Sequence, residues 1–396
     1  TCRTLRGSAA RPSRVQHDGG GGTALRDGEC KLAIRACTLA AFTLLAVPAA
    51  ASLYQPEEPT ALAVKADGTP EPLDFDEFQS RMVTLANVAN PKPNEKGEPN
   101  RDRAKFLERV RRFQSKMNPT PDELAAHSAD LLRLGNTDRG FYLDKAIDLL
   151  VPHTRDRIPN YFLLMMLAQV HLARGELREA LNVYDNTLLD AKMPAAVKGW
   201  TDPQRAWFEK LDTDYLGHYL QLRIADKEHP VPPDREEPTA LFPLPVKGKD
   251  TPPLRFVNEA GEYEPGNLAA AERAKLPPNA IAIVQQMLLW FPSDTRLYWL
   301  LAELYAAEGK LDEADTIFYQ CTWGRQFGNR KSLMEHKGVL LAALEARRLQ
   351  REKDQIDAYP INLKLVWWYF GGVVLLAALA VVRGRRKRSA LDCPKC

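Results

Sequence analysis

Cysteine is scarce in this sequence, and the long middle of the chain has almost none of it. The chain has 396 residues and six cysteines, which are Cys2, Cys30, Cys37, Cys321, Cys393 and Cys396. All but Cys321 lie near the two ends, so the middle cannot hold an internal disulfide in any compartment. With 45% hydrophobic and 27% charged residues, the composition is that of a globular protein with one large domain or two.

The chain also lacks an excess of charge of one sign. Its formal net charge is +3, and much of that excess falls in the last residues, from Arg383 onward. The body therefore has no polyelectrolyte character of the kind that binds nucleic acid. We expect its partners to be proteins or peptides, and no nucleic acid.

Motifs for catalysis are absent as well. The sequence has no HExxH, no GxSxG, no GxxxxGK[ST] and no GxGxxG. Its histidines are scattered, and no pair of carboxylates stands out as a general acid and base. We therefore expect that the protein is not an enzyme, has no catalytic residues and needs no cofactor for catalysis.

Two long apolar runs bound the middle of the chain. The first is KLAIRACTLAAFTLLAVPAAAS, in which Lys31 and Arg35 precede an apolar stretch and Ala49 and Ala51 form an A-x-A pattern. This arrangement is typical of a secretory signal peptide over residues 31–51, with cleavage after about Ala51. The alternative is an uncleaved anchor, and in either case the residues that follow are exported.

The second apolar run predicts a transmembrane helix over residues 363–382. Leu365 to Val382 are 18 residues without a charge, and Arg383, Arg385 and further basic residues follow them. By the positive-inside rule the tail is cytoplasmic and the region between the two runs lies outside the cytoplasm. We expect a single-pass protein of the cytoplasmic (inner) membrane, with a bacterial source indicated by the signal pattern and the lack of exported disulfides.

The basic tail, residues 383–396, ends in a CPKC motif. Cys393 and Cys396 have the spacing of one half of a tetrahedral zinc site, which needs four ligands. Three interpretations remain open: half of a zinc ribbon from a longer chain, a zinc site shared by two chains, or a reducible thiol pair. Zinc at this incomplete site is the one cofactor that the sequence suggests.

The exported region contains a repeat with a period of 34 residues. LDKA begins at Leu143 and LREA begins at Leu177, and LDEA follows at Leu311. The two best copies, around residues 160–189 and 296–321, align without a gap, each with two apolar helices joined at a glycine. Small residues let the paired helices approach, and the signature positions are Ala168, Gly175, Ala180, Ala302, Gly309 and Ala314.

This pattern resembles the tetratricopeptide repeat (TPR) family over about residues 122–194 and 278–349. The resemblance implies an all-α fold, a TPR-like solenoid of helical hairpins. The density of prolines adds a proline-rich insertion to this prediction, and the second apolar run adds one C-terminal transmembrane helix. The domains are expected to be a disordered extension 1–30, the signal peptide 31–51, a polar linker 52–100, helical repeats 101–227, the insertion 228–277, repeats 278–349, a juxtamembrane segment 350–362, the span 363–382 and the tail 383–396.

The resemblance further implies a groove for a protein or peptide partner, lined by the first helix of each hairpin. The matching positions are Phe162, Met165, Gln169 and Leu172 in one copy, and Arg296, Trp299, Glu303 and Ala306 in the other. Neither set has the Lys and Asn of the family members that bind C-terminal carboxylates, so a helix or an extended apolar segment is the expected ligand. The alternative is that the protein's own insertion, at residues 230–256, fills the groove.

Together these features predict a non-catalytic, membrane-anchored TPR scaffold that binds its partner on the extracytoplasmic face of the membrane. A second hypothesis is an accessory subunit that presents a substrate protein to an enzyme of envelope biogenesis or cytochrome maturation.

Overall fold

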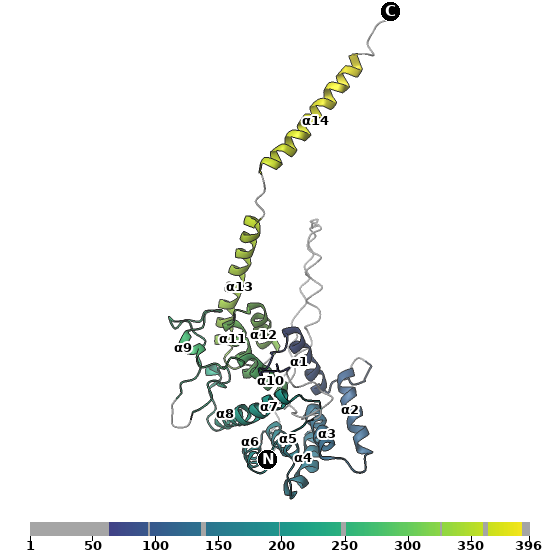
Figure 1. Cartoon of the computed structure of the whole chain (residues 1–396), viewed down its shortest axis with the longest axis vertical. Coiled ribbons are helices and arrows are strands. Elements are labelled where there is room, and N and C mark those ends of the chain that lie inside the picture. The colour runs from purple at the N-terminus through teal and green to yellow at the C-terminus, as the bar shows by residue number, and fades with distance from the viewer. Residues whose placement is uncertain are drawn as a thin grey trace, which may run out of the picture. The chain divides into compact units, whose positions relative to one another are not determined.

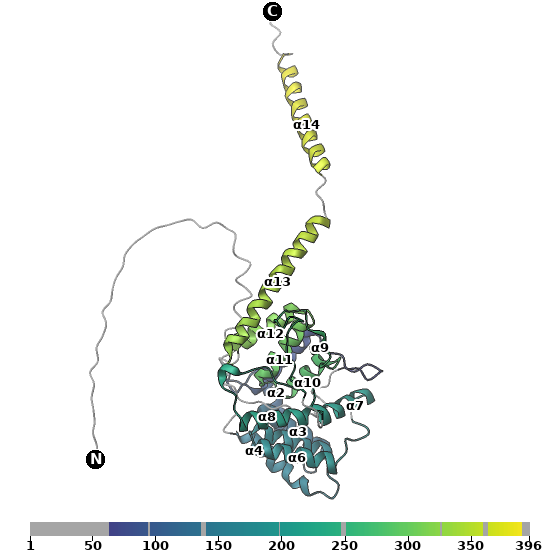
Figure 2. The same ribbon diagram turned by 90° about the vertical axis from the view of Figure 1, so that its left-hand side faces the viewer.

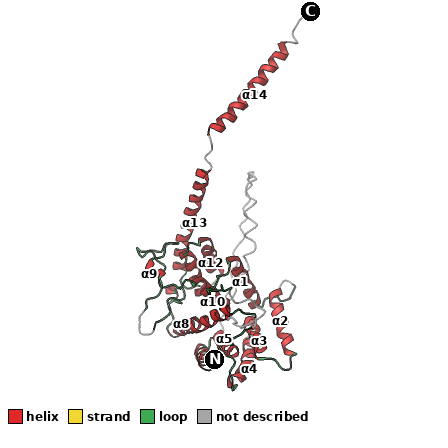
Figure 3. Cartoon of the chain, viewed as in Figure 1, coloured by secondary structure: helices red, strands yellow, loops and turns green. Residues whose placement is uncertain are grey.

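The named elements of the described residues are all helices, which confirms the all-α fold class (Figure 3). A computed structural model describes residues 63–93, 96–135, 140–197, 199–246, 251–324, 327–358 and 363–389. Within these ranges the β-type pairing consists of one isolated bridge between Val64 and Pro70. The expected extension 1–30 and signal peptide 31–51 lie outside the described residues.

The helices follow one another along the chain (Figure 1). They are α1 Phe75–Ala89, α2 Arg101–Gln114, α3 Pro121–Leu134, α4 Phe141–Leu150, α5 Tyr161–Ala173, α6 Leu177–Asp190, α7 Asp202–Lys210, α8 Gly217–Glu228, α9 Ala270–Arg273, α10 Ala280–Trp290, α11 Thr295–Ala307, α12 Leu311–Gly324, α13 Arg330–Ala358 and α14 Leu363–Ser389. Short turns of other helix types are Val151–Arg155, the π-helical Leu211–Leu216 and Pro233–Arg235.

The two best repeat copies form two helical hairpins, α5–α6 and α11–α12. In Figure 2, α6 lies lower in the view than α11 and α12. Gly175 and Gly309 close them with the same left-handed turn, each at φ 73°. In the first turn the amide of Glu176 donates to the His171 carbonyl at 2.9 Å, and in the second Lys310 donates to Tyr305 at 2.9 Å. These are the carbonyls that the end of a helix leaves without a partner.

The other signature positions also have matching surroundings in the two hairpins. Ala168, Ala180, Ala302 and Ala314 are all buried, so each pair of helices packs closely at a small side chain. The first helix of each hairpin begins at a side-chain cap: Asn160 accepts from the Leu163 amide at 3.1 Å, and Asp294 accepts from the Leu297 amide at 2.9 Å.

A later helix contacts the glycine turn of each hairpin in the same way. From α8, Lys227 Nζ donates to the Gly175 carbonyl at 2.8 Å, and from α13 an Arg347 amino group donates to the Gly309 carbonyl at 2.9 Å. The helix pairs α6–α8 and α12–α13 are in contact. The region of α5, α6 and α8, here called the first half of the body, and the region of α11, α12 and α13, here called the second half, are therefore built from equivalent local units.

Buried arginines join the N-terminal helices to one another and to α10. Arg103 donates to the Val88 carbonyl at the end of α1 at 2.6 Å, and Arg133 donates to the Leu289 carbonyl in α10 at 2.9 Å. Both guanidinium groups satisfy carbonyls in the last turn of a helix and complement its dipole. Thr120 forms a capping box with Glu123 at the start of α3, as the sequence predicts.

The described residues of the proline-rich insertion are mostly irregular, with the short helical segments Pro233–Arg235 and Ala270–Arg273, because its prolines exclude a long helix. The Thr239 amide donates to the Arg296 carbonyl at 3.3 Å, and Leu241 and Phe242 are buried in the core. Helix α14 carries exposed apolar side chains from Trp367 to Val382. Among the side chains that the structure describes, no helix has both the length and the apolar character that crossing a membrane requires.

The glycine turns give a direct test of the hairpin geometry. Gly309→Ala should lower the free energy of unfolding by about 1–2 kcal/mol, since a Cβ at positive φ is strained even where the space around it is open. Gly338→Ala is the matched control: it lies inside α13 with no atom near the added Cβ, and should raise stability by roughly 0.5–1 kcal/mol. Urea unfolding followed by circular dichroism measures both. An equal response of the two variants would contradict the turn assignment.

Candidate functional site

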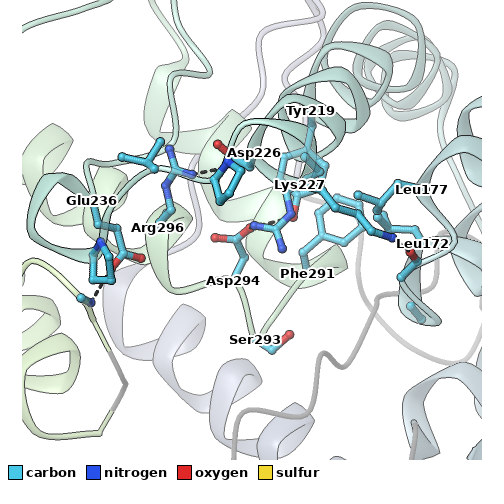
Figure 4. A pocket seen from close by; sticks show the side chains of 17 residues that line it. Leu172, Leu177, Tyr219, Asp226, Lys227, Glu236, Phe291, Ser293, Asp294 and Arg296 are labelled. Carbon is cyan, nitrogen blue, oxygen red and sulfur yellow. Dashed lines mark hydrogen bonds and ion pairs between the residues drawn. The ribbon is translucent and has the colours of Figure 1, made fainter.

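A pocket of about 750 Å³ lies where the two halves of the body meet. Its walls come from the α5–α6 turn, α8, the residues before α11 and the proline-rich segment at Pro230–Glu236. In Figure 4, Arg296 and Asp226 lie at one side, Leu172 and Leu177 at the other, and Asp294 between them. Val231 is 48% exposed, so the pocket is reached from solvent.

The carboxylate of Asp294 organises the inner wall of the pocket. One of its oxygens caps α11, and the other accepts a hydrogen bond from the Tyr219 hydroxyl at 2.7 Å. A guanidinium nitrogen of Arg223 lies 3.6 Å from the same oxygen. Burial and then the Asp294 charge raise the pKa of Tyr219 well above its usual value, which keeps the hydroxyl protonated as a donor. The ring of Tyr219 stacks on Phe291 with centroids 4.5 Å apart.

A second ion pair lies at the side of the pocket next to the insertion. Arg296 pairs with Asp226 at 2.6 Å and also donates to the Glu237 carbonyl at 2.7 Å. Glu236 accepts a hydrogen bond from the Gly328 amide at 2.5 Å. These contacts join the insertion to the start of α11 and to the chain that follows α12.

The charges that line the pocket balance one another. Three cations, Arg223, Lys227 and Arg296, face three carboxylates, Asp226, Glu236 and Asp294. Each of the six has a partner within the protein. Between them the wall is apolar, with Leu172, Leu177, Phe291 and the prolines of the insertion. Such a mixed and neutral surface suits a polypeptide segment better than a strongly charged ligand.

Most residues of the expected partner groove are buried instead of lining an open groove. Phe162, Met165, Gln169, Trp299 and Glu303 are each at most 4% exposed, and Ala306 is buried as well. Only Leu172 and Arg296 of the expected set lie on the pocket. The structure therefore corrects the expectation that the first helices of the hairpins present these side chains to a partner.

The physical reason is that distant parts of the chain cover both surfaces. Trp200 packs against the ring of Phe162 at 6.2 Å, and Phe327 packs against Trp299 at 5.7 Å. The insertion contributes at Arg296, in part as the alternative interpretation expected. The residues that do organise the pocket, Arg223, Asp226 and Asp294, have no common sequence signal. Only Asp294, placed before an apolar helix, matches a helix-cap pattern.

A buried cluster beside α13 holds the end of the insertion in place. One oxygen of Glu303 accepts from the Trp299 indole at 2.8 Å and bonds Nδ1 of His336 at 2.6 Å, while the His336 ring stacks on Tyr263 at 3.9 Å. Burial, the largest single influence, acts to lower the pKa of His336, but the hydrogen bond to Glu303 together with the charges of Glu303 and Glu335 raises the pKa overall. The free space here is about 10 Å³, which leaves no room for a ligand.

A second buried carboxyl, that of Asp212, lies in the π-helical turn between α7 and α8. The Tyr161 hydroxyl donates to this carboxyl group at 2.7 Å, and the Tyr184 hydroxyl donates to the backbone carbonyl of Asp212 at 2.6 Å. Burial, the largest influence, raises the pKa of Asp212 to about 7. Because Asp212 is only 2% exposed, this cluster is part of the packed interior and is not an accessible site.

Metal ligands do not gather anywhere in the described part of the chain. No group of three or more His, Cys, Asp or Glu side chains there could hold a metal ion. Cys393 and Cys396, the residues of the suggested zinc site, lie outside the described residues.

Comparisons with models of protein families, with curated proteins and with solved structures found no match to this chain. The site must therefore be interpreted from its own geometry.

Asp212 predicts a specific pH dependence of stability. The folded state keeps the proton up to about pH 7, whereas the unfolded chain loses it near pH 4, so stability from this group falls as the pH rises between these values. As the pH is raised from 5 to 8, the free energy of unfolding of Asp212→Asn should increase by about 2–3 kcal/mol relative to that of the wild type, since each pKa unit corresponds to about 1.4 kcal/mol. Urea unfolding at several pH values measures this. Asp214→Asn, in the same turn but exposed, is the control and should keep the wild-type profile.

Proposed function

We propose that this protein is a non-catalytic, membrane-anchored scaffold with TPR-like hairpins, and that it binds a protein or peptide partner outside the cytoplasm. The observation that carries the proposal is the neutral, solvent-reached pocket of about 750 Å³ between the two halves of the body. Its charged groups are all engaged within the protein, and its apolar wall is open. An extended polypeptide segment with apolar side chains is the ligand that such a surface fits.

The equivalence of the two hairpins supports the TPR-like part of the proposal. They share a glycine turn at φ 73°, a side-chain cap, a buried alanine on each helix and a cation from a later helix on the glycine carbonyl. In helical-repeat proteins, stacked hairpins of this kind are used mainly for binding other proteins.

The membrane anchor is supported by the sequence and by the surface of α14. The uncharged run extends from Leu365 to Val382. The structure describes the side chains of this run from Trp367 onward. From Trp367 onward the large apolar side chains are at least half exposed, which is unfavourable in water and favourable in lipid. By the positive-inside rule, the basic residues after Val382 support a cytoplasmic tail.

The topology can be tested by labelling cysteines from outside the cell. In a chain with Cys393→Ser and Cys396→Ser, a cysteine at the exposed Gln350 should react with a membrane-impermeant maleimide on intact spheroplasts. In the otherwise unchanged chain, Cys393 and Cys396 should react only after the membrane is permeabilised. Labelling of the tail on intact cells, or equal labelling in both conditions, would contradict the proposed orientation.

The pocket can be tested by site-specific photocrosslinking in native membranes. A photoreactive amino acid at Val231, on the pocket wall, should give one discrete adduct, and Leu172→Glu should remove it by placing a charge on the apolar wall. The matched control is the same probe at Leu189, an 82% exposed apolar position of α6 outside the pocket wall, which should give none. Mass spectrometry identifies the partner.

The outcomes separate the competing functions. A redox or processing enzyme in the adduct would favour the accessory-subunit hypothesis. Equal adducts from both positions, or an adduct that Leu172→Glu does not affect, would contradict partner binding at this pocket.

A further inference from the structure

Gln285 is a buried amide on α10 that holds the main chain of a distant segment. It is 0% exposed, and its amide oxygen accepts from the Leu73 backbone amide at 2.8 Å. Its amide nitrogen donates to the Leu73 carbonyl at 3.0 Å and to the Tyr305 hydroxyl at 3.0 Å. Both polar groups of one backbone residue are thus paired with one side chain, as a neighbouring β-strand would pair them.

The side chains of this segment add contacts on the same surface. Phe75 meets the ring of Tyr305 edge to face at 5.7 Å, and Leu73 packs half-buried against the core. Glu71 and Pro72, just before them, are exposed. Further along, Gln320 on α12 donates to Gln79 at 2.7 Å, and α1 lies beside α10 (Figure 1).

Residues 70–75 therefore dock as a bound peptide does. From Glu71 to Asp74 they belong to no helix or strand, and they are held by the hydrogen bonds of Gln285 and by two apolar side chains two positions apart. Because Gln285 pairs with the main chain, these hydrogen bonds impose no sequence requirement. The contacts of the Leu73 and Phe75 side chains do favour particular residue types at those two positions. The surface can thus recognise any extended segment with the same two apolar positions.

We propose that Gln285 and Tyr305 form a peptide-binding site, here called the Gln285 clamp, which the chain's own residues 70–75 occupy. The clamp takes in trans an extended polypeptide segment of a partner protein, with an aliphatic residue followed two positions later by an aromatic one. The internal segment then acts as a competitor that sets the affinity for the partner. This site is separate from the pocket near Asp294 and rests on neither that pocket nor the membrane anchor.

The test uses the full chain in detergent and a fluorescein-labelled peptide with the sequence of residues 68–79, GTPEPLDFDEFQ. Phe75→Ala in the protein weakens the internal competitor, and should tighten binding of the peptide by about tenfold, the effect of losing one aromatic contact. Adding Gln285→Leu to that variant should abolish the gain. Circular dichroism confirms folding, and Gln285→Glu, which keeps the acceptor and loses both amide donors, replaces Gln285→Leu should that variant fail to fold.

Backbone methylation of the peptide isolates the clamp from side-chain packing. A methyl group on the nitrogen of Leu73 removes the donor that Gln285 accepts from, and should weaken binding at least about tenfold with every side chain unchanged. The same methyl group on Asp74, an exposed residue whose amide Gln285 does not contact, is the control and should have little effect. Equal binding of the two methylated peptides, or no gain on Phe75→Ala, would overturn the proposal.

Discussion

The buried carboxylate of Asp294 is the contact on which the arrangement of the two halves depends. It caps α11 through the Leu297 amide, accepts a hydrogen bond from Tyr219 on α8 and lies within reach of Arg223. A carboxylate with its side chain only 5% exposed is stable when such partners surround it, because an unpaired buried charge is costly. One side chain thus caps the start of a helix in the second half, contacts the first half and forms the inner wall of the pocket between them.

Long cationic side chains repeat this role at the ends of other helices. Arg103 and Arg133 reach helix-terminal carbonyls in the core, and Lys227 and Arg347 reach the glycine carbonyls of the two hairpin turns. The last carbonyls of a helix need donors, and a cation from a neighbouring helix supplies one while complementing the helix dipole. In this protein the same bonds that finish one helix hold the next one against it.

Segments that follow the two repeat copies explain why an open groove is missing at the expected positions. The repeat pattern tells which faces of α5 and α11 are apolar, and those faces are indeed buried. It does not tell what covers them, because Trp200 and Phe327 come from segments outside the repeat copies. The space for a ligand lies instead at the junction of the halves, where the proline-rich segment cannot pack as a helix.

The sequence by itself determined the features that depend on neighbouring residues. Helices follow from apolar periodicity, the turns at Gly175 and Gly309 from the need for positive φ, and the start of α3 from the Thr120–Glu123 capping box, because these interactions join residues within about one helical turn. Only the tertiary structure decided the pairing of Asp294 with Tyr219 and of Gln285 with Leu73, which are 75 and 212 positions apart. Contacts over such separations leave no period or spacing in the chain, since they depend on how whole helices pack together.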